Sequence, residues 1–267
     1  MSSPAFESSM RPPAPVYLVG KGVILETLRR KDVYVLLILS LLFVAGIFVI
    51  SLVGIENAAT STFLLNLGMS LAYFFAHLLT LLSAARQIPA ELENRTLYPI
   101  LAKPLSRGQY YLGKWLAVWL SGVVTLVVLF LLGWLPVPRM ETYSSLLLAQ
   151  TFVLYVCSLA LTASVAMFLS LVMPRGSSMI LLALLLFAGG KIIGWIHDSS
   201  QHLPLSRVIH WGIAYIPDFS LLNLTTRYTD GIDPLSLPQF CGLILYGSIF
   251  TAFFLALGTL LFRKRSL

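Results

Sequence analysis

Six long apolar runs dominate this 267-residue sequence and restrict the folds that it can adopt. The runs cover residues 33–55, 61–85, 112–135, 144–172, 178–196 and 240–262. Each is close to the length of about 20 residues that a helix needs to cross a bilayer. None of the six contains an aspartate or a glutamate. The sequence therefore predicts an all-α, polytopic membrane protein with six transmembrane helices.

The composition excludes several other classes of protein. Charged residues make up 11% of the chain, whereas soluble domains carry about 25%. The net charge of +7 does not indicate nucleic-acid binding, because the basic residues lie between the apolar runs and do not form a stripe along one face. Cys157 and Cys241 are too few and too far apart for a disulfide framework or a metal site, so we interpret both as packing residues.

The positions of lysine and arginine predict the orientation of the helices. Basic residues precede the first run, fill the connection between the second and third runs, and follow the last run. These connections alternate along the chain and share one side of the membrane, which the positive-inside rule places in the cytoplasm. We therefore expect both termini to be cytoplasmic and the protein to lie in the inner membrane of a bacterial cell.

The segments outside the runs give further expectations. Residues 1–15 are rich in Ser and Pro and predict a disordered tail, and we expect residues 16–267 to form a single transmembrane domain. Residues 16–32 predict a short amphipathic helix in the membrane interface, with an ordinary charged lead-in as the alternative. The external segment 197–239 contains aromatic and aliphatic residues that predict short helices dipping into the outer interface.

The sequence contains no convincing catalytic or cofactor site. Residues 108–115 resemble a phosphate-binding loop, but Trp115 stands where that loop needs a hydroxyl for magnesium. The histidines at 197, 202 and 210 fit no compact metal-ligand set. Of the ionisable residues in the runs, we interpret Lys191 as snorkelling outward and His77 as hydrogen-bonded to a neighbouring helix, with a proton relay as its alternative. We therefore expect neither an enzyme nor a bound cofactor or metal.

Gly190 and Gly194 lie four residues apart in the fifth run. Two glycines at this spacing make a smooth patch that lets another helix approach closely. The partner helix belongs either to the same chain or to a second copy in a dimer, and the sequence leaves both open.

The loop between the second and third runs, residues 86–111, is the most distinctive segment. Pro89 marks its start, and Pro99 and Pro104 interrupt it, so it predicts a short helix, a turn and a second helical start at Ser106. Charged residues alternate there with Leu97, Leu101 and Leu105. A solvated connection does not need these leucines, but a surface that docks on another protein does.

Three motifs in this region carry a resemblance to a known family. They are ELENRTL at 91–97, LAKPLSR at 101–107 and YYLGK at 110–114. Together they resemble the loop between helices two and three of type-2 (export-type) permease subunits of ATP-binding cassette transporters. The branch that includes permeases of copper-enzyme maturation and gliding motility is the most similar. Many members have glycine where this chain has Arg95.

The resemblance implies that this loop is a coupling helix, which sits in a groove of a separate ATP-hydrolysing subunit. The residues implied in that contact are Glu91, Glu93, Arg95, Thr96, Leu97, Pro104, Ser106 and Arg107. It also implies a second permease chain, identical or different, and a surrounding of membrane lipid. ATP and magnesium would then be bound by the partner.

These observations favour a permease subunit that converts ATP hydrolysis elsewhere into export or conformational work. The alternative is a polytopic scaffold or a lipid-modifying membrane enzyme that does not depend on ATP. The substrate stays open, because the scattered Ser, Thr, Asn and Gln of the runs suit lipids, hydrophobic drugs or a conformational signal equally well.

Overall fold

The computed structural model describes residues 31–52, 58–93, 107–134, 144–200 and 217–264. All regular structure in these residues is helical, which confirms the all-α prediction for the described part. Six long helices follow one another: α2 (Lys31–Leu52), α3 (Ala58–Glu93), α5 (Arg107–Trp134), α6 (Ser145–Val172), α7 (Arg175–Ser200) and α10 (Leu237–Lys264). A short 3₁₀ helix, η1 (Phe219–Leu222), and the short helix α9 (Thr225–Thr229) precede α10.

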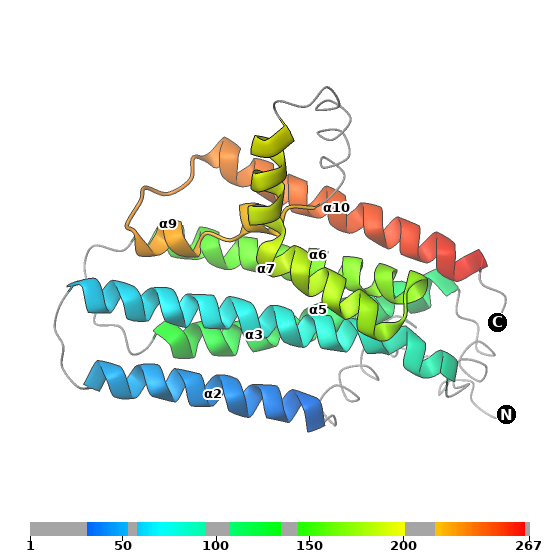
Figure 1. Ribbon diagram of the computed structural model, residues 1–267, viewed down its shortest axis with the longest axis horizontal. Coiled ribbons are helices and arrows are strands. Elements are labelled where there is room, and N and C mark those ends of the chain that lie inside the picture. The colour runs from blue at the N-terminus through cyan, green and yellow to red at the C-terminus, as the bar shows by residue number, and fades with distance from the viewer. Residues whose placement is uncertain (1–30, 53–57, 94–106, 135–143, 201–216, 265–267) are drawn as a thin grey trace, which may run out of the picture.

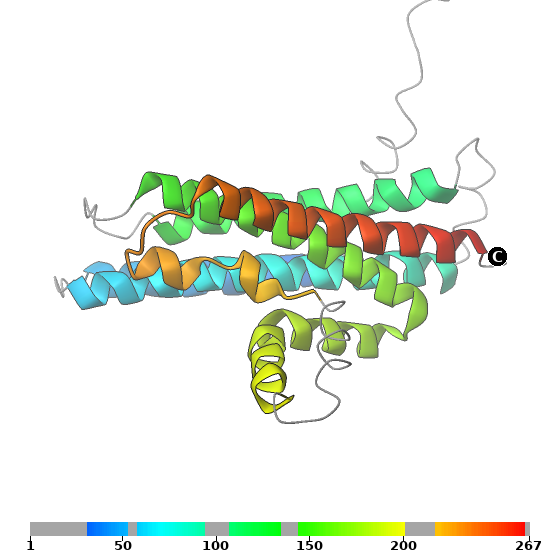
Figure 2. The same ribbon diagram turned by 90° about the horizontal axis from the view of Figure 1, so that it is seen from above.

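The long helices form an up-and-down bundle (Figure 1). We call the end where α3 finishes and α5 begins the Arg107 end, and the other the Ser144 end. α6 and α10 also finish at the Arg107 end. α7 follows the bundle for its first part and then turns away from it, as Figure 2 shows from above. Each of the six predicted apolar runs falls on one of these helices.

Four helical segments are long and apolar enough to cross a membrane: Thr62–Ala85, Arg107–Leu132, Ser145–Val172 and Leu237–Lys264. The apolar part of α7, Gly176–Gly190, is shorter. The protein is therefore a multi-pass membrane protein with four candidate spans in its described residues. The two further crossings, by α2 and α7, and the orientation of the termini stay predictions.

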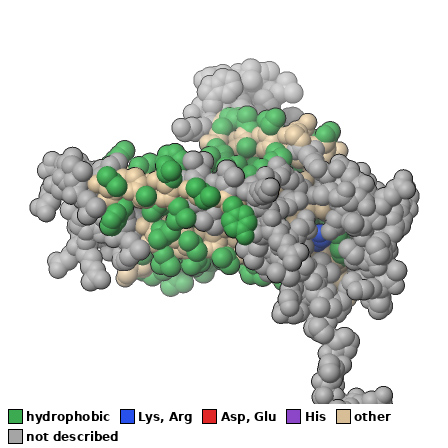
Figure 3. All heavy atoms as spheres, turned by 90° about the horizontal axis from the view of Figure 1, so that it is seen from below, with side chains coloured by type: hydrophobic (Ala, Val, Ile, Leu, Met, Phe, Trp, Pro, Cys, Tyr) green, Lys and Arg blue, Asp and Glu red, His purple; other side chains and the backbone are tan. Residues whose placement is uncertain are grey.

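The outer surface of the bundle is apolar. Large side chains such as Ile38, Val124, Ile180 and Leu245 are more than half exposed, and Figure 3 shows hydrophobic side chains over much of the described surface of one face. A water-facing surface would be largely charged and polar. This distribution suits contact with lipid tails.

α6 is the central helix and packs against α3, α5, α7 and α10. Its buried face includes Ser158, Thr162, Ala163, Ser164 and Ala166. Small residues let helix backbones approach closely where no hydrophobic effect drives helices together. The hydroxyls of Thr162 and Ser164 donate to carbonyls of their own helix, each at 2.8 Å, so they leave no unpaired group in the core.

One helix boundary of the structure differs from expectation. α3 does not stop at Ala85 but continues through Pro89 to Glu93, because a proline removes only one hydrogen bond and the residues after it favour helix. The described part of residues 197–239 forms the predicted short helices, η1 and α9, which pack one face against α3, α6 and α7. Phe219, Leu222 and Tyr228 are buried on that face. The position of both helices at the outer interface stays a prediction. The predicted tail 1–15, most of the interfacial helix 16–32, and residues 201–216 lie outside the described residues.

Candidate functional site

Three of the predicted docking residues lie at the Arg107 end of the described structure. Glu91 and Glu93 belong to the last turn of α3, and Arg107 is the first residue of α5. The remaining candidates, Arg95, Thr96, Leu97, Pro104 and Ser106, lie outside the described residues. The structure thus places the two helical borders of the predicted loop side by side, because α3 and α5 pack along their lengths.

α10 also reaches this end of the bundle. The Arg107 guanidinium donates from Nη1 to the carbonyl oxygen of Arg263, at 3.2 Å. Arg263 and Lys264 are exposed and form the last turn of α10. The start of α5 is therefore tied to the end of the last helix as well as to α3.

A buried lysine, further along α5 than Arg107, also connects α5 to α3. Lys114 is only 3% exposed, and its Nζ donates to Oε1 of Gln87, which is equally buried, at 2.9 Å. The same ammonium lies over the ring of Tyr110, 5.5 Å from its centre. Sequence reasoning placed Lys114 near the start of the third apolar run and missed this contact. Its signal was a lone basic residue among apolar ones, one turn after the tyrosine pair.

The tyrosine pair packs α5 against α10. Tyr110 stacks on Phe262, and Tyr111 contacts the same ring at a tilt of 34°. The Tyr111 hydroxyl lies against Gly258, where any larger residue would meet it. Within the described residues neither tyrosine hydroxyl has a hydrogen-bond partner. The end of α3, the start of α5 and the end of α10 thus pack together through four side chains: Tyr110, Tyr111, Lys114 and Phe262.

A second polar cluster lies at mid-length of the bundle. His77 of α3 is fully buried, with Nδ1 2.8 Å from the carbonyl oxygen of Tyr73 and Nε2 2.9 Å from the Ser158 hydroxyl. A carbonyl only accepts, so Nδ1 carries the proton and Nε2 accepts from Ser158. The neutral imidazole is fully satisfied by its own chain, in line with a packing role for His77.

We expect the His77→Leu substitution to lower stability by about 1 to 2 kcal/mol, because the buried Ser158 hydroxyl loses its 2.9 Å hydrogen bond and keeps only the 3.3 Å contact with the Tyr73 hydroxyl. The double variant His77→Leu, Ser158→Ala removes both partners of this hydrogen bond. It should be about 1 kcal/mol more stable than His77→Leu alone. The fraction of monodisperse protein after heating in detergent measures both. Strict additivity of the two single losses would contradict this pairing.

The segment before α10 is anchored to the bundle by hydrogen bonds. The Tyr155 hydroxyl of α6 contacts both the Thr225 hydroxyl and Oδ1 of Asn223. Farther toward the Ser144 end, the Gln150 amide exchanges two hydrogen bonds with the backbone of Leu235, both at 2.9 Å. Asn66 of α3 donates to Thr229 at 3.1 Å. Sequence reasoning did not foresee these anchors, because they join residues 68 to 163 positions apart.

The same segment places a partly buried carboxylate, that of Asp218, next to the bundle. The Asp218 amide donates to the Tyr246 hydroxyl, and Tyr246 lies about 14 Å into α10 at 1.5 Å per residue. The carboxylate accepts from the amide and hydroxyl of Ser220, at 2.9 and 2.7 Å. None of the apolar runs contains an acid, so this placement was not visible in the sequence.

Gly190 makes room for η1. A side chain at this position would meet Ser220 and the Asp218 carboxylate. Its close contact is therefore with the same chain, and the contact of Gly194 stays a prediction, as does any dimer contact of either glycine. In the described residues, no group of three His, Cys, Asp or Glu side chains is placed to hold a metal ion.

Comparison with known proteins supports one family. Residues 24–267 match the family model described as ABC-2 family transporter protein. No curated protein matches the chain. The match covers nearly the whole sequence and every helix of the described structure. In this family the membrane subunit has no ATPase activity, binds no cofactor and works with a separate ATPase. The chain belongs to the ABC-2 transporter family and is the permease component of an ATP-binding cassette transporter.

Proposed function

We propose that residues 86–111 form the docking element of this permease, and that the Arg107 end faces the cytoplasm, where the ATPase subunit binds. The observation that carries the proposal is the convergence of α3, α5 and α10 on the two borders of this segment. α3 has 36 residues, which is about 54 Å of helix at 1.5 Å per residue. That length exceeds the bilayer core of about 30 Å, so its last turns project toward the partner.

The contacts suggest how movement of the segment would reach the membrane. Lys114 and Gln87 make α5 and α3 move together at this end. Arg107 and the tyrosine pair pass the same movement to α10. α6 packs against all three helices, and the hydrogen bonds of Tyr155 and Gln150 connect it to the segment before α10. Closure of the ATPase dimer would thus rearrange the bundle along its whole length.

The proposal includes the finer expectations from the sequence. The chain crosses the bacterial inner membrane six times with both termini in the cytoplasm, and it pairs with a second permease chain in surrounding lipid. It belongs with the permeases of copper-enzyme maturation and gliding motility. The length of α2, 22 residues, and its apolar sequence support the first crossing.

Single-cysteine labelling tests both the docking and the orientation. Cys157 and Cys241 are first replaced by alanine, because Cys241 is exposed on α10 and would itself react. In intact cells a cysteine at Ser106 should resist a membrane-impermeant maleimide, whereas one at Ser200 should react. After co-purification with the ATPase, the Ser106 cysteine should form a cross-link to that subunit with a short bifunctional reagent.

The matched control is the Ser200 cysteine, which should give no cross-link to the ATPase. Labelling at Ser106 but not at Ser200 in intact cells would overturn the orientation. Correct labelling without any cross-link from Ser106 would overturn the docking and leave the orientation standing.

A further inference from the structure

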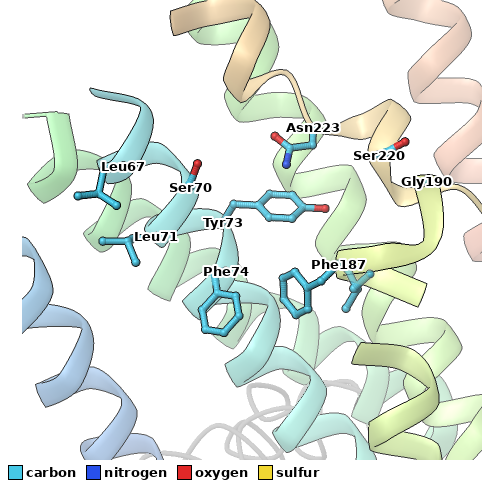
Figure 4. A pocket seen from close by; sticks show the side chains of 10 residues that line it. Leu67, Ser70, Leu71, Tyr73, Phe74, Phe187, Gly190, Ser220 and Asn223 are labelled. Carbon is cyan, nitrogen blue, oxygen red and sulfur yellow. The ribbon is translucent and has the colours of Figure 1, made fainter. Parts of the chain in front are cut away.

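A pocket of about 440 Å³ opens between α3, α7 and η1. Most of its wall is apolar, with Leu67 and Leu71 from α3 and Leu186 from α7. The size falls within the range of about 300 to 1,000 Å³ that is usual for sites of small molecules. Figure 4 shows the lining side chains and the three elements from which they come.

One polar group in the wall lacks a protein partner. Oδ1 of Asn223 accepts from the backbone amide of Thr225, at 3.0 Å, and also from the hydroxyls of Thr225 and Tyr155. A backbone amide only donates, so these contacts fix which end of the Asn223 side chain is oxygen. The amino group Nδ2 then lies on the pocket side, toward α3 (Figure 4), and donates to no group among the described residues.

The other polar side chains of the wall are already engaged. The Tyr73 hydroxyl turns away from the pocket toward Ser158 of α6, so Tyr73 lines the pocket with its ring. The Ser70 hydroxyl donates to Asn66 at 3.1 Å. No charged residue is among the lining residues that the structure describes. The Asp218 carboxylate lies next to this wall but is engaged by the amide and hydroxyl of Ser220. A ligand that fits this wall is therefore neutral and mainly apolar, and it accepts one hydrogen bond.

The mouth of the pocket lies on the apolar surface of the bundle. Phe74 of α3 and Phe187 of α7 line it, are 39% and 40% exposed, and place their ring centres 4.8 Å apart. Both helices carry further exposed apolar residues, such as Phe63 and Leu184, which favours entry from the hydrocarbon around the bundle. An amide without a partner is costly in an apolar environment.

We propose that this pocket binds a neutral, chain-like apolar molecule whose carbonyl or hydroxyl oxygen accepts a hydrogen bond from Nδ2 of Asn223. The oxygen satisfies the unpaired amide, and the hydrocarbon part fills the space between Leu67, Leu71 and Leu186. Such molecules come from two sources, a membrane lipid or an apolar solute dissolved in the bilayer. Binding is a property of this chain alone and does not depend on docking of an ATPase.

Photolabelling of the purified chain in nanodiscs, without any ATPase, tests the pocket. The probe is the methyl ester of a diazirine-bearing twelve-carbon fatty acid, and labelled peptides are found by mass spectrometry. Label is expected on residues 67–74 and 186–190. Unlabelled methyl laurate should compete at least fivefold better than dodecane, which lacks the acceptor oxygen.

Two variants make the result decisive. Asn223→Asp keeps the oxygen that Thr225 and Tyr155 contact but replaces the donor, and should reduce labelling about tenfold. Leu71→Trp fills the pocket and should abolish labelling, whereas Leu245→Trp on the exposed face of α10 is the matched control that should not. Lipid that co-purifies with the wild type but not with Leu71→Trp would identify a membrane lipid as the source. Its absence, with competition by methyl laurate intact, would identify a solute.

Labelling that is unchanged in Asn223→Asp and Leu71→Trp, or that dodecane blocks as well as methyl laurate, would overturn the proposal. Because no ATPase is present, either outcome leaves the docking proposal untouched. A failed cross-link from Ser106 would in turn leave the pocket untouched.

Discussion

Reversing the charges of Glu91, Glu93 and Arg107 together is expected to reduce co-purification of the ATPase subunit at least tenfold and to abolish its stimulation by the permease. Glu91 and Glu93 end α3 and Arg107 begins α5, so all three border the predicted docking segment. Like charges that face each other across an interface cost several kcal/mol, and each 1.4 kcal/mol corresponds to a tenfold change in affinity. Pull-down from solubilised membranes and ATP hydrolysis in nanodiscs measure the two effects.

The control reverses charge at the opposite end of the bundle. Asp230→Lys with Asp233→Lys alters two exposed residues that follow α9, far from Arg107, and should leave both measurements at the wild-type level. Arg107→Gln separates two roles of that residue, because it loses the charge and the hydrogen bond to Arg263 but introduces no repulsion. Wild-type yield of the complex and normal ATP hydrolysis in the triple variant would show that docking occurs elsewhere.

The sequence predicted the long helices because length and hydropathy alone decide whether a segment is stable in a bilayer. Thr62–Ala85, Arg107–Leu132, Ser145–Val172 and Leu237–Lys264 all coincide with predicted runs. The motifs at 91–97 and 101–107 likewise pointed to the family that residues 24–267 match. These properties are local, so they can be read from the order of residues without knowledge of packing.

What the sequence did not reveal depends on contacts between distant residues. Nothing local shows that Lys114 meets Gln87, or that Tyr155 holds Thr225. η1 packs close to α7 because Gly190 leaves space for it, and because the Tyr246 hydroxyl accepts a hydrogen bond from the Asp218 amide. Pro89 predicted a helix boundary, yet the helix continues to Glu93. In each case tertiary packing decided between outcomes that the local sequence left open.

The hydroxyl groups of the core explain how a chain with so few charges specifies one packing arrangement. Lipid tails are as apolar as leucine, so burial of leucine does not by itself bring membrane helices together. Close contact at small residues and a limited number of hydrogen bonds must therefore bring the helices together. α3, α5 and α6 meet in this way around Gly122, where a side chain would contact Thr80 and Leu159.

Substituting Gly122 is therefore expected to have a large effect on folding of the bundle. In Gly122→Ala the added methyl meets the Thr80 hydroxyl, which cannot turn away without breaking its 2.8 Å hydrogen bond to the Ala76 carbonyl. Overpacking of this kind costs about 1 to 3 kcal/mol. Gly122→Leu adds three more carbons at the same point and should yield little monodisperse protein. Size-exclusion chromatography of detergent extracts before and after heating measures both.

A second substitution tests whether the close approach of Gly122 to Thr80 causes the loss of stability. Thr80→Ala removes the hydroxyl that the new methyl meets and leaves only ordinary contacts, with Cβ of residue 80 at 3.4 Å and with Leu159 at 3.6 Å. The Gly122→Ala, Thr80→Ala pair should therefore regain most of the lost stability. Gly242→Ala in α10 is the matched control, since nothing lies within 4 Å of the added methyl. There alanine should be neutral or stabilise by up to about 1 kcal/mol, because glycine disfavours helix. Equal losses at Gly122 and Gly242, or no rescue by Thr80→Ala, would mean that contact between α3 and α5 at this point does not determine the stability of the bundle.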